Sequence, residues 1–293
     1  MTKLDCSIML VDPLNLSSTP IAMLSELGLK TYAGVSSDDP KSERHLTTEF
    51  IVVLSAYGVN GLISRAIIDR LPPHHHKFYC LDDELQKMSI PEPVRLCALH
   101  RVPANLIKDD TIPEAVELDE VPDFDMYRIV VQYGTTSGSM GSVIYETPPN
   151  FNRVSKRGEF LSFSNKIYVS EQADTHLIFL NYSVNRTYSD SAQLHFNLYD
   201  SAGSLVSNKT LDVPSFNFVA INSKELMPTN PSKFYSYVAS AIGNSLIPLS
   251  VIVCKSNGGV SVEHSHPPQA YIMADWQINS GIKRAAAIHC AGG

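Results

Sequence analysis

The hydrophobic pattern of the sequence changes across one acidic segment. Residues 104–125, ANLIKDDTIPEAVELDEVPDFD, hold eight carboxylates, one lysine and two prolines. Because like charges repel and proline interrupts regular elements, such a stretch favours an extended connection. The 293 residues suffice for two domains with separate cores. We therefore expect a domain at 1–105, an acidic linker at 106–125 and a second domain at 126–293; alternatively, the segment is an acidic edge of one larger domain.

Before the linker, apolar runs alternate with segments of helical spacing. CSIMLV (6–11) and FIVVLSAYG (50–58) are continuous apolar runs, which are typical of buried parallel strands. TPIAMLSELG (19–28) and NGLISRAIIDRL (60–71) have the spacing of amphipathic helices. HKFYCL (76–81) and VRLCALH (94–100) are strand-like, with a helical turn at DDELQKM (82–88) between them. This alternation predicts an α/β domain with a doubly wound parallel sheet of the flavodoxin or receiver type.

After the linker, period-two alternation replaces helical spacing. In AQLHFNLY (192–199), Leu194, Phe196 and Leu198 fall on one face, and Gln193, His195 and Asn197 fall on the other. DSAG (200–203) has the composition of a hairpin turn, with glycine where a positive φ is needed. Many short strands separated by turn signals predict an antiparallel β-sandwich or barrel, of which we take the sandwich.

The N-terminal stretch IMLVDPLNLSSTPIAMLSELGLKTYAG (8–34) resembles the opening of response-regulator receiver domains. The resemblance covers residues 4–105. Three positions depart from that family: Asp12 stands beside Pro13 without a second acid, Ser55 lies near the expected phosphoacceptor aspartate, and His100-Arg101 precede Val102-Pro103 near the usual Lys-Pro. The resemblance therefore implies a pseudo-receiver that binds partners without being phosphorylated.

Residues 158–255 resemble the small β-sandwich of sensory-rhodopsin transducer proteins. The shared features are an alternating strand that ends in Tyr, a glycine turn, a strand that closes on Val-Pro and a short acidic helix, here SKEL (223–226). This resemblance implies a non-enzymatic sandwich that binds a protein or a small ligand.

The stretch SVEHSHPPQAY (261–271) concentrates Glu263, His264, His266 and Tyr271. His264 and His266 are two residues apart, so in a strand both project from one face, and Glu263 projects from the other. Two imidazoles on one face can bind a transition metal such as Zn²⁺, but they need a further ligand, for which His289 is a candidate. The alternative is a polar rim of histidines hydrogen-bonded to backbone or to a partner, and we expect no cofactor in that case.

Aromatic and amide side chains favour carbohydrate contacts, because rings stack on sugars while amides bond to hydroxyls. The candidates of this kind are Tyr182 and Asn181, together with Tyr133, Tyr145, Phe151, Asn150 and Asn152. The leading hypothesis is thus a non-catalytic binding or signalling adaptor, a pseudo-receiver joined to a β-sandwich that recognises a protein or a glycan. The alternative is a metal-dependent enzyme centred on the His264-x-His266 pair.

Charge and composition exclude other classes. The net charge of −7 argues against nucleic-acid binding, and no apolar run is long enough to span a membrane. Five scattered cysteines without CxxC spacing, and an N-terminus unlike a signal peptide, predict a cytoplasmic protein with free thiols. A homo-oligomer is compatible with these features.

Overall fold

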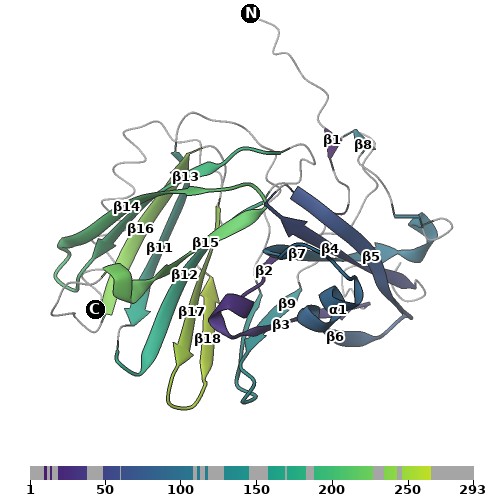
Figure 1. Cartoon of the computed structure of the whole chain (residues 1–293), viewed down its shortest axis with the longest axis horizontal. Helices are drawn as coiled ribbons and strands as arrows, with labels where there is room; N and C mark the ends of the chain where they lie inside the picture. Colours follow the sequence, from purple (N-terminus) through teal and green to yellow (C-terminus); the bar gives the residue numbers. More distant parts are fainter. Residues whose placement is uncertain are drawn as a thin grey trace, which may run out of the picture.

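The computed structural model describes a protein built from antiparallel strands (Figure 1). The residues described are 10–11, 14, 19–37, 49–59, 61–107, 111–112, 116–117, 129–144, 158–168, 170–182, 188–226, 234–242 and 246–264. Within them lie one α-helix, α1 (Leu81–Lys87), and short 3-10 turns, η2 (Ser25–Leu27), η4 (Ala104–Leu106) and η6 (Ser223–Leu226). No helix among these residues is long and apolar enough to cross a membrane.

The N-terminal half contains two four-stranded sheets. Sheet I has the order β2 (Thr19–Ala22), β7 (Leu96–Pro103), β4 (Phe50–Gly58), β5 (Gly61–Leu71). Sheet II has the order β10 (Met140–Ile144), β9 (Val130–Gly134), β3 (Lys30–Ser36), β6 (His76–Cys80). All of these neighbours pair antiparallel.

The prediction of a doubly wound parallel α/β domain is therefore wrong, and the fold that the receiver resemblance implied is absent from the described residues. The segment NGLISRAIIDRL supplies strand β5 instead of a helix, and TPIAMLSELG supplies β2 and the turn η2. β5 pairs with β4 through a tight turn that brings Gly58 opposite Gly61, whose φ is +96°. The segments 50–58, 76–81 and 94–100 do form strands as expected, β4, β6 and β7, and the helical turn expected at 82–88 overlaps α1.

The C-terminal half forms the antiparallel sheets that its alternation predicted. Sheet III has the order β15 (Asn217–Asn222), β12 (Ala173–Asn181), β17 (Leu246–Cys254), β18 (Val260–His264). Sheet IV has the order β11 (Gly158–Tyr168), β16 (Phe234–Ile242), β13 (Ala192–Tyr199), β14 (Leu205–Val213).

Sheet III is buried on both faces. Along β12, Leu177 and Phe179 pack with residues of sheet IV, whereas Ile178 and Leu180 pack with residues of sheets I and II. Figure 1 shows sheet III lying between the other sheet of the sandwich and the N-terminal strands. Because β-strand side chains alternate between faces, one strand can serve two cores at once.

The chain crosses the predicted domain boundary in two places. β9 and β10 follow the acidic segment but extend sheet II, where β9 pairs with β3. Within the segment itself, β8 (Val116–Glu117) pairs antiparallel with β1 (Leu10–Val11). The boundary at 106–125 thus does not coincide with a break between sheets, and independent folding of the two pieces stays a prediction.

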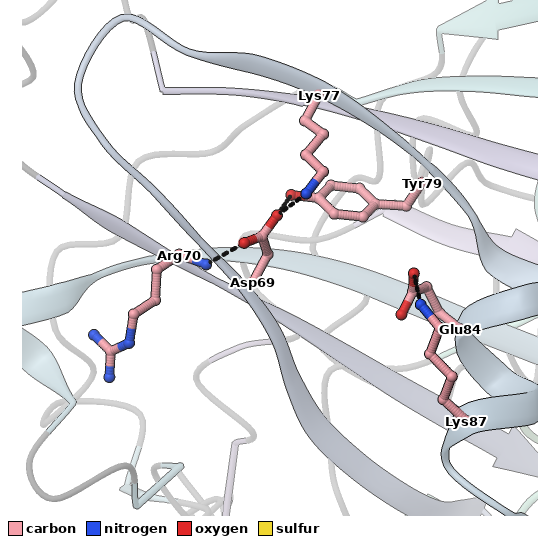
Figure 2. A network of polar contacts seen from close by, with 6 residues as sticks. All are labelled: Asp69, Arg70, Lys77, Tyr79, Glu84 and Lys87. Atoms are coloured by element: carbon pink, nitrogen blue, oxygen red, sulfur yellow. Dashed lines mark hydrogen bonds and ion pairs between the residues drawn. The ribbon is translucent and has the colours of Figure 1, made fainter.

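A polar network joins β5 to β6 near their connection (Figure 2). The Asp69 carboxylate accepts hydrogen bonds from the Lys77 ammonium, from the Tyr79 hydroxyl at 3.0 Å and from the Arg70 backbone N–H at 2.8 Å. Partial burial alone would raise the pKa of Asp69, but these three donors outweigh it and lower the pKa below its usual value. The network fixes the connection between sheets I and II.

Candidate functional site

The predicted HxH site is described only in part. Glu263 and His264 end strand β18, where Glu263 pairs with Ser250 and His264 with Leu249. The register is regular and Val262 is buried toward the N-terminal half, so Glu263, which is exposed, lies on the opposite face from His264. His266, Tyr271 and His289 lie outside the described residues. Within the described ranges, no group of three His, Cys, Asp or Glu side chains could hold a metal ion. The metal site stays a prediction.

Asn181 is buried and bonded within the C-terminal half. The Asn181 amide donates to the Val213 carbonyl at 2.8 Å and the Asp190 carbonyl at 3.3 Å, and its Oδ1 accepts from the Tyr188 hydroxyl at 3.0 Å. These bonds link the end of β12 to residues 188–190 and to the end of β14. The Asn181 amide is therefore fully engaged in hydrogen bonds within the protein.

Tyr182 belongs to an aromatic cluster between the halves. Its ring meets Tyr57 edge-on at 5.8 Å between centroids and Phe216 at 5.7 Å, while Tyr57 and Phe216 stack at 5.1 Å. Because Tyr182 is 0% exposed, its ring takes part in packing in this structure. A role of Asn181 or Tyr182 in ligand binding stays a prediction; both side chains are buried in this structure, so a ligand could contact them only if they became exposed.

A buried serine–histidine pair, not predicted from the sequence, lies in sheet I. Ser55 Oγ is 2.7 Å from His100 Nε2, and His100 Nδ1 is 2.9 Å from the Leu14 carbonyl. A carbonyl only accepts, so Nδ1 carries the proton and Nε2 accepts from Ser55. Arg65 Nε in turn donates to Ser55 Oγ at 2.7 Å.

The hydrogen bonds of this pair resemble those between a catalytic serine and its histidine base, but a substrate could not reach them. Ser55 and His100 are both 0% exposed. Burial, reinforced by the Arg65 charge, lowers the pKa of His100 to about 3 even though its bond to Leu14 acts in the other direction. The imidazole is therefore neutral, and the arrangement satisfies buried polar groups. The sequence signal was weak, because isolated polar residues within apolar strands are common.

The outward face of sheet IV presents a set of accessible polar side chains. Leu194, Phe196 and Leu198 of β13 pack inward, so the alternate residues of β13 point away from the core. These are Gln193, His195, Asn197 and Tyr199. None of them is buried, and Gln193 is exposed.

Register places further polar side chains beside them. On β14, Asp212 pairs with Gln193, Thr210 with His195 and Asn208 with Asn197. All three partners are exposed, and Thr210 Oγ1 lies 3.1 Å from His195 Nδ1. We call these seven residues, with Tyr199 included, the β13–β14 face. On the other side of β13, Val238 and Ser236 of β16 are buried, so the accessible part of the sheet is the β13–β14 half.

The turn between β13 and β14 fixes the register of this face. Asp200 Oδ1 accepts the backbone N–H groups of Ala202 at 2.9 Å and Ser204 at 2.8 Å, and Gly203 has a φ of +80° as its position in DSAG predicted. Next to the turn, Tyr199 pairs with Leu205, which is 51% exposed. Tyr199 and Leu205 thus form an apolar end to the otherwise polar β13–β14 face.

The chemistry of the face is hydrogen bonding without strong charge. Three amide groups, a hydroxyl, an imidazole and a phenol supply donors and acceptors, and Asp212 is the one charged residue of the seven. Exposed sheet surfaces ordinarily rely on lysine and glutamate for solubility. The sequence had placed Gln193, His195 and Asn197 on one face, but their partners on β14 required the structure.

Comparisons with known proteins add little. No family model matches the sequence, and none of the curated proteins matches it. Among solved structures, a β-glucuronidase from glycoside hydrolase family 2 aligns with 84% of this chain and 23% of its own, at 13% identity and a TM-score of 0.20. The Bacteroides uniformis β-glucuronidase 2 covalently bound to cyclophellitol-6-carboxylate aziridine aligns with 90% and 28%, at 10% identity and a TM-score of 0.16. The chain thus spans about a quarter of the length of these enzymes, and at such TM-scores the likeness gives no information on function.

Proposed function

We propose that the protein is a non-catalytic glycan-binding protein and that the β13–β14 face binds a neutral oligosaccharide. The supporting observation is the two-strand array of amide, hydroxyl and imidazole side chains in register, with Tyr199 at one end. This keeps the carbohydrate partner expected from the sequence but assigns it to residues other than Asn181 and Tyr182.

Sugar hydroxyls both donate and accept, so they match side chains that do the same. Asn197 and Asn208, paired across the strands, present two carbonyl acceptors and two NH₂ donors side by side. Each hydrogen bond gained contributes about 0.5–1.5 kcal/mol, because water is displaced from both partners. Several are needed, and a two-strand array supplies them.

The two ends of the face differ, because Tyr199 lies at one end and the amide side chains lie further along β13. The Tyr199 ring can cover the apolar C–H side of a sugar ring, with Leu205 beside it, while the amides bond to hydroxyls further along β13. From Tyr199 to Gln193 the strand rises by about 20 Å at ~3.4 Å per residue. The length suits a chain of several sugars better than one ring.

Charge selects among glycans. The face carries the Asp212 carboxylate and no lysine or arginine. A carboxylated or sulfated sugar would meet repulsion without a compensating cation. The proposal therefore specifies neutral glycans.

The test is a glycan array probed with the labelled full-length protein, followed by titration calorimetry on the strongest neutral ligand. Replacing one amide, in Asn197→Ala or Asn208→Ala, is expected to weaken binding about 3- to 10-fold, the loss of one hydrogen bond. Asn105→Ala removes an exposed amide on η4, away from this face, and should leave the affinity unchanged.

Two results would count against the proposal. One is an array signal confined to sialylated or sulfated glycans, or none at all. The other is neutral-glycan binding that Asn197→Ala, Asn208→Ala and Tyr199→Ala leave intact, which would move the site elsewhere on the molecule.

A further inference from the structure

A second surface, distinct from the β13–β14 face, is hollowed beside helix α1. The hollow measures about 310 Å³ and is lined by residues of three segments. These are Met23 and Ser25 before and within η2, then Asp82, Leu85 and Gln86 of α1, and finally Ser89, Ile90, Glu92 and Val94 of the loop that leads to β7. We call it the α1 groove.

The floor of the α1 groove is apolar. Met23 is 4% exposed and belongs to the main core, while Leu85 and Val94 pack against that core and stay half-exposed, as does Ile90. Exposed Ser25, Gln86, Ser89 and Glu92 form the rim. An apolar floor within a polar rim is the composition of small binding sites.

The charge of the lining is entirely negative. Asp82 and Glu92 are its two ionisable groups, and no lysine or arginine lines it. Asp82 Oδ2 accepts the Thr31 backbone N–H at 2.7 Å, so this carboxylate is held in place. The nearby cations are engaged elsewhere: Lys87 with Glu84 at 2.7 Å, Lys30 with Asp83 at 3.5 Å, and Arg95 with Glu26. Glu92 therefore faces solvent without a basic neighbour in the lining.

The loop wall of the groove is anchored at its end. The Arg95 carbonyl accepts the Met23 N–H at 2.9 Å, and the Arg95 N–H donates to the Tyr57 carbonyl at 3.1 Å. The Arg95 guanidinium lies 4.4 Å from the centroid of the Phe218 ring. On the rim, Ser89 has a φ of +53°, which a non-glycine residue adopts at a cost of about 1 kcal/mol. A wall held in this way keeps its shape when a ligand enters.

We propose that the α1 groove docks a short segment of a partner protein that presents one apolar side chain next to one lysine or arginine. The apolar side chain contacts the floor formed by Met23, Leu85, Ile90 and Val94, and the cation lies at Glu92. The size supports this class of occupant, because about 310 Å³ is at the lower end of ligand sites and accommodates one or two side chains. The charge excludes acidic segments.

The test uses the full-length protein and a displayed library of random peptides about ten residues long. Enriched peptides are expected to share a Lys or Arg adjacent to Leu, Ile or Met. One of them, fluorescein-labelled, is then titrated by fluorescence polarisation. Glu92→Gln should weaken its binding about 3- to 5-fold at low salt, and Ile90→Ser about 10-fold, since few contacts carry most of the energy of a small interface.

Controls separate this site from others. Glu171→Gln removes an exposed carboxylate in the turn before β12 and should not change peptide binding. With ¹³C-methyl methionine, the Met23 signal should shift on adding peptide, while that of Met140, which is 48% exposed on β10, should not. The methyl readout needs no variant at the groove, and Asn197→Ala should leave peptide affinity unchanged.

The proposal is overturned if no peptides are enriched, or if the enriched peptides lack a cation or are acidic. It is also overturned if Glu92→Gln and Ile90→Ser, with unchanged circular dichroism, bind the peptide like the wild type, or if the Met23 signal stays fixed at saturation.

Discussion

His100 makes the stability of this fold depend on pH from about 6.5 downward, a range that begins above the ordinary pKa values of carboxylates. Its imidazole is completely buried between Ser55 and the Leu14 carbonyl, and burial lowers its pKa from 6.5 to about 3. The unfolded chain accepts the proton near pH 6.5, whereas the folded chain does not accept it until about pH 3. The stabilisation is complete above pH 6.5 and is lost as the pH falls toward 3.

The size of the loss follows from proton linkage. Each pH unit between the two pKa values is worth about 1.4 kcal/mol. At about pH 5 the free energy of unfolding should therefore be about 2 kcal/mol lower than at about pH 7.5 on account of His100 alone. His176, half-buried with a pKa lowered mainly by burial, acts in the same direction, so total pH dependence does not isolate His100.

The variant His100→Asn isolates it. At about pH 7.5 we expect the free energy of unfolding of the variant to be about 2–3 kcal/mol lower than that of the wild type. The reason is that Ser55 loses its hydrogen-bond acceptor and the smaller side chain leaves a cavity. At about pH 5 that difference should shrink by about 2 kcal/mol, because Asn does not titrate. Urea unfolding followed by far-ultraviolet circular dichroism at several pH values measures it. A wild-type-minus-variant difference that is constant over this range would refute the claim that His100 is buried and neutral.

Four further predictions concern the fold and the HxH segment. Gly61→Ala should cost about 1–2 kcal/mol in thermal or urea unfolding, because φ is +96° there; an unchanged stability would contradict the tight turn between β4 and β5. Asn181→Ala should cost about 2–3 kcal/mol by leaving the Val213 carbonyl and the Tyr188 hydroxyl without their amide partner, with glycan affinity unchanged once the protein is folded. Protease cleavage within 118–128 should give two fragments that co-elute in size-exclusion chromatography, because β3 pairs with β9 across the cut, and fragments that separate while folded would support the two-domain prediction. Elemental analysis of untagged protein tests the predicted metal site at His264. Less than about a tenth of an equivalent of transition metal per protein would contradict it, because a structural site would bind metal stoichiometrically.

The second half of the molecule could be interpreted locally. In β13 the alternation of Leu194, Phe196 and Leu198 with polar residues follows from the two-residue period of a strand with one buried face. The turn at DSAG followed from the same local rules, because glycine adopts the positive φ that Gly203 has. Here short-range preference and tertiary environment agreed.

The first half could not be interpreted in this way. GLISRAIIDRL has apolar residues at spacings that suit a helix, yet it forms β5 against β4. The Asn60-Gly61 dipeptide before it, between two apolar runs, was the local hairpin signal. β4 is buried on both faces, so it had no alternation and resembled a parallel strand.

The sequence by itself determined which residues are apolar, where period-two strands lie in the C-terminal half and which side chains share a face of β13. Only the tertiary structure decided that β9 returns to β3 across the acidic segment, that Asn181 and Tyr182 are buried, and that Asn208 stands beside Asn197. The physical reason is that strand pairing depends on contacts between residues far apart in the chain. Alternation specifies the face of a strand, but its neighbours are selected by the combined packing of all the sheets.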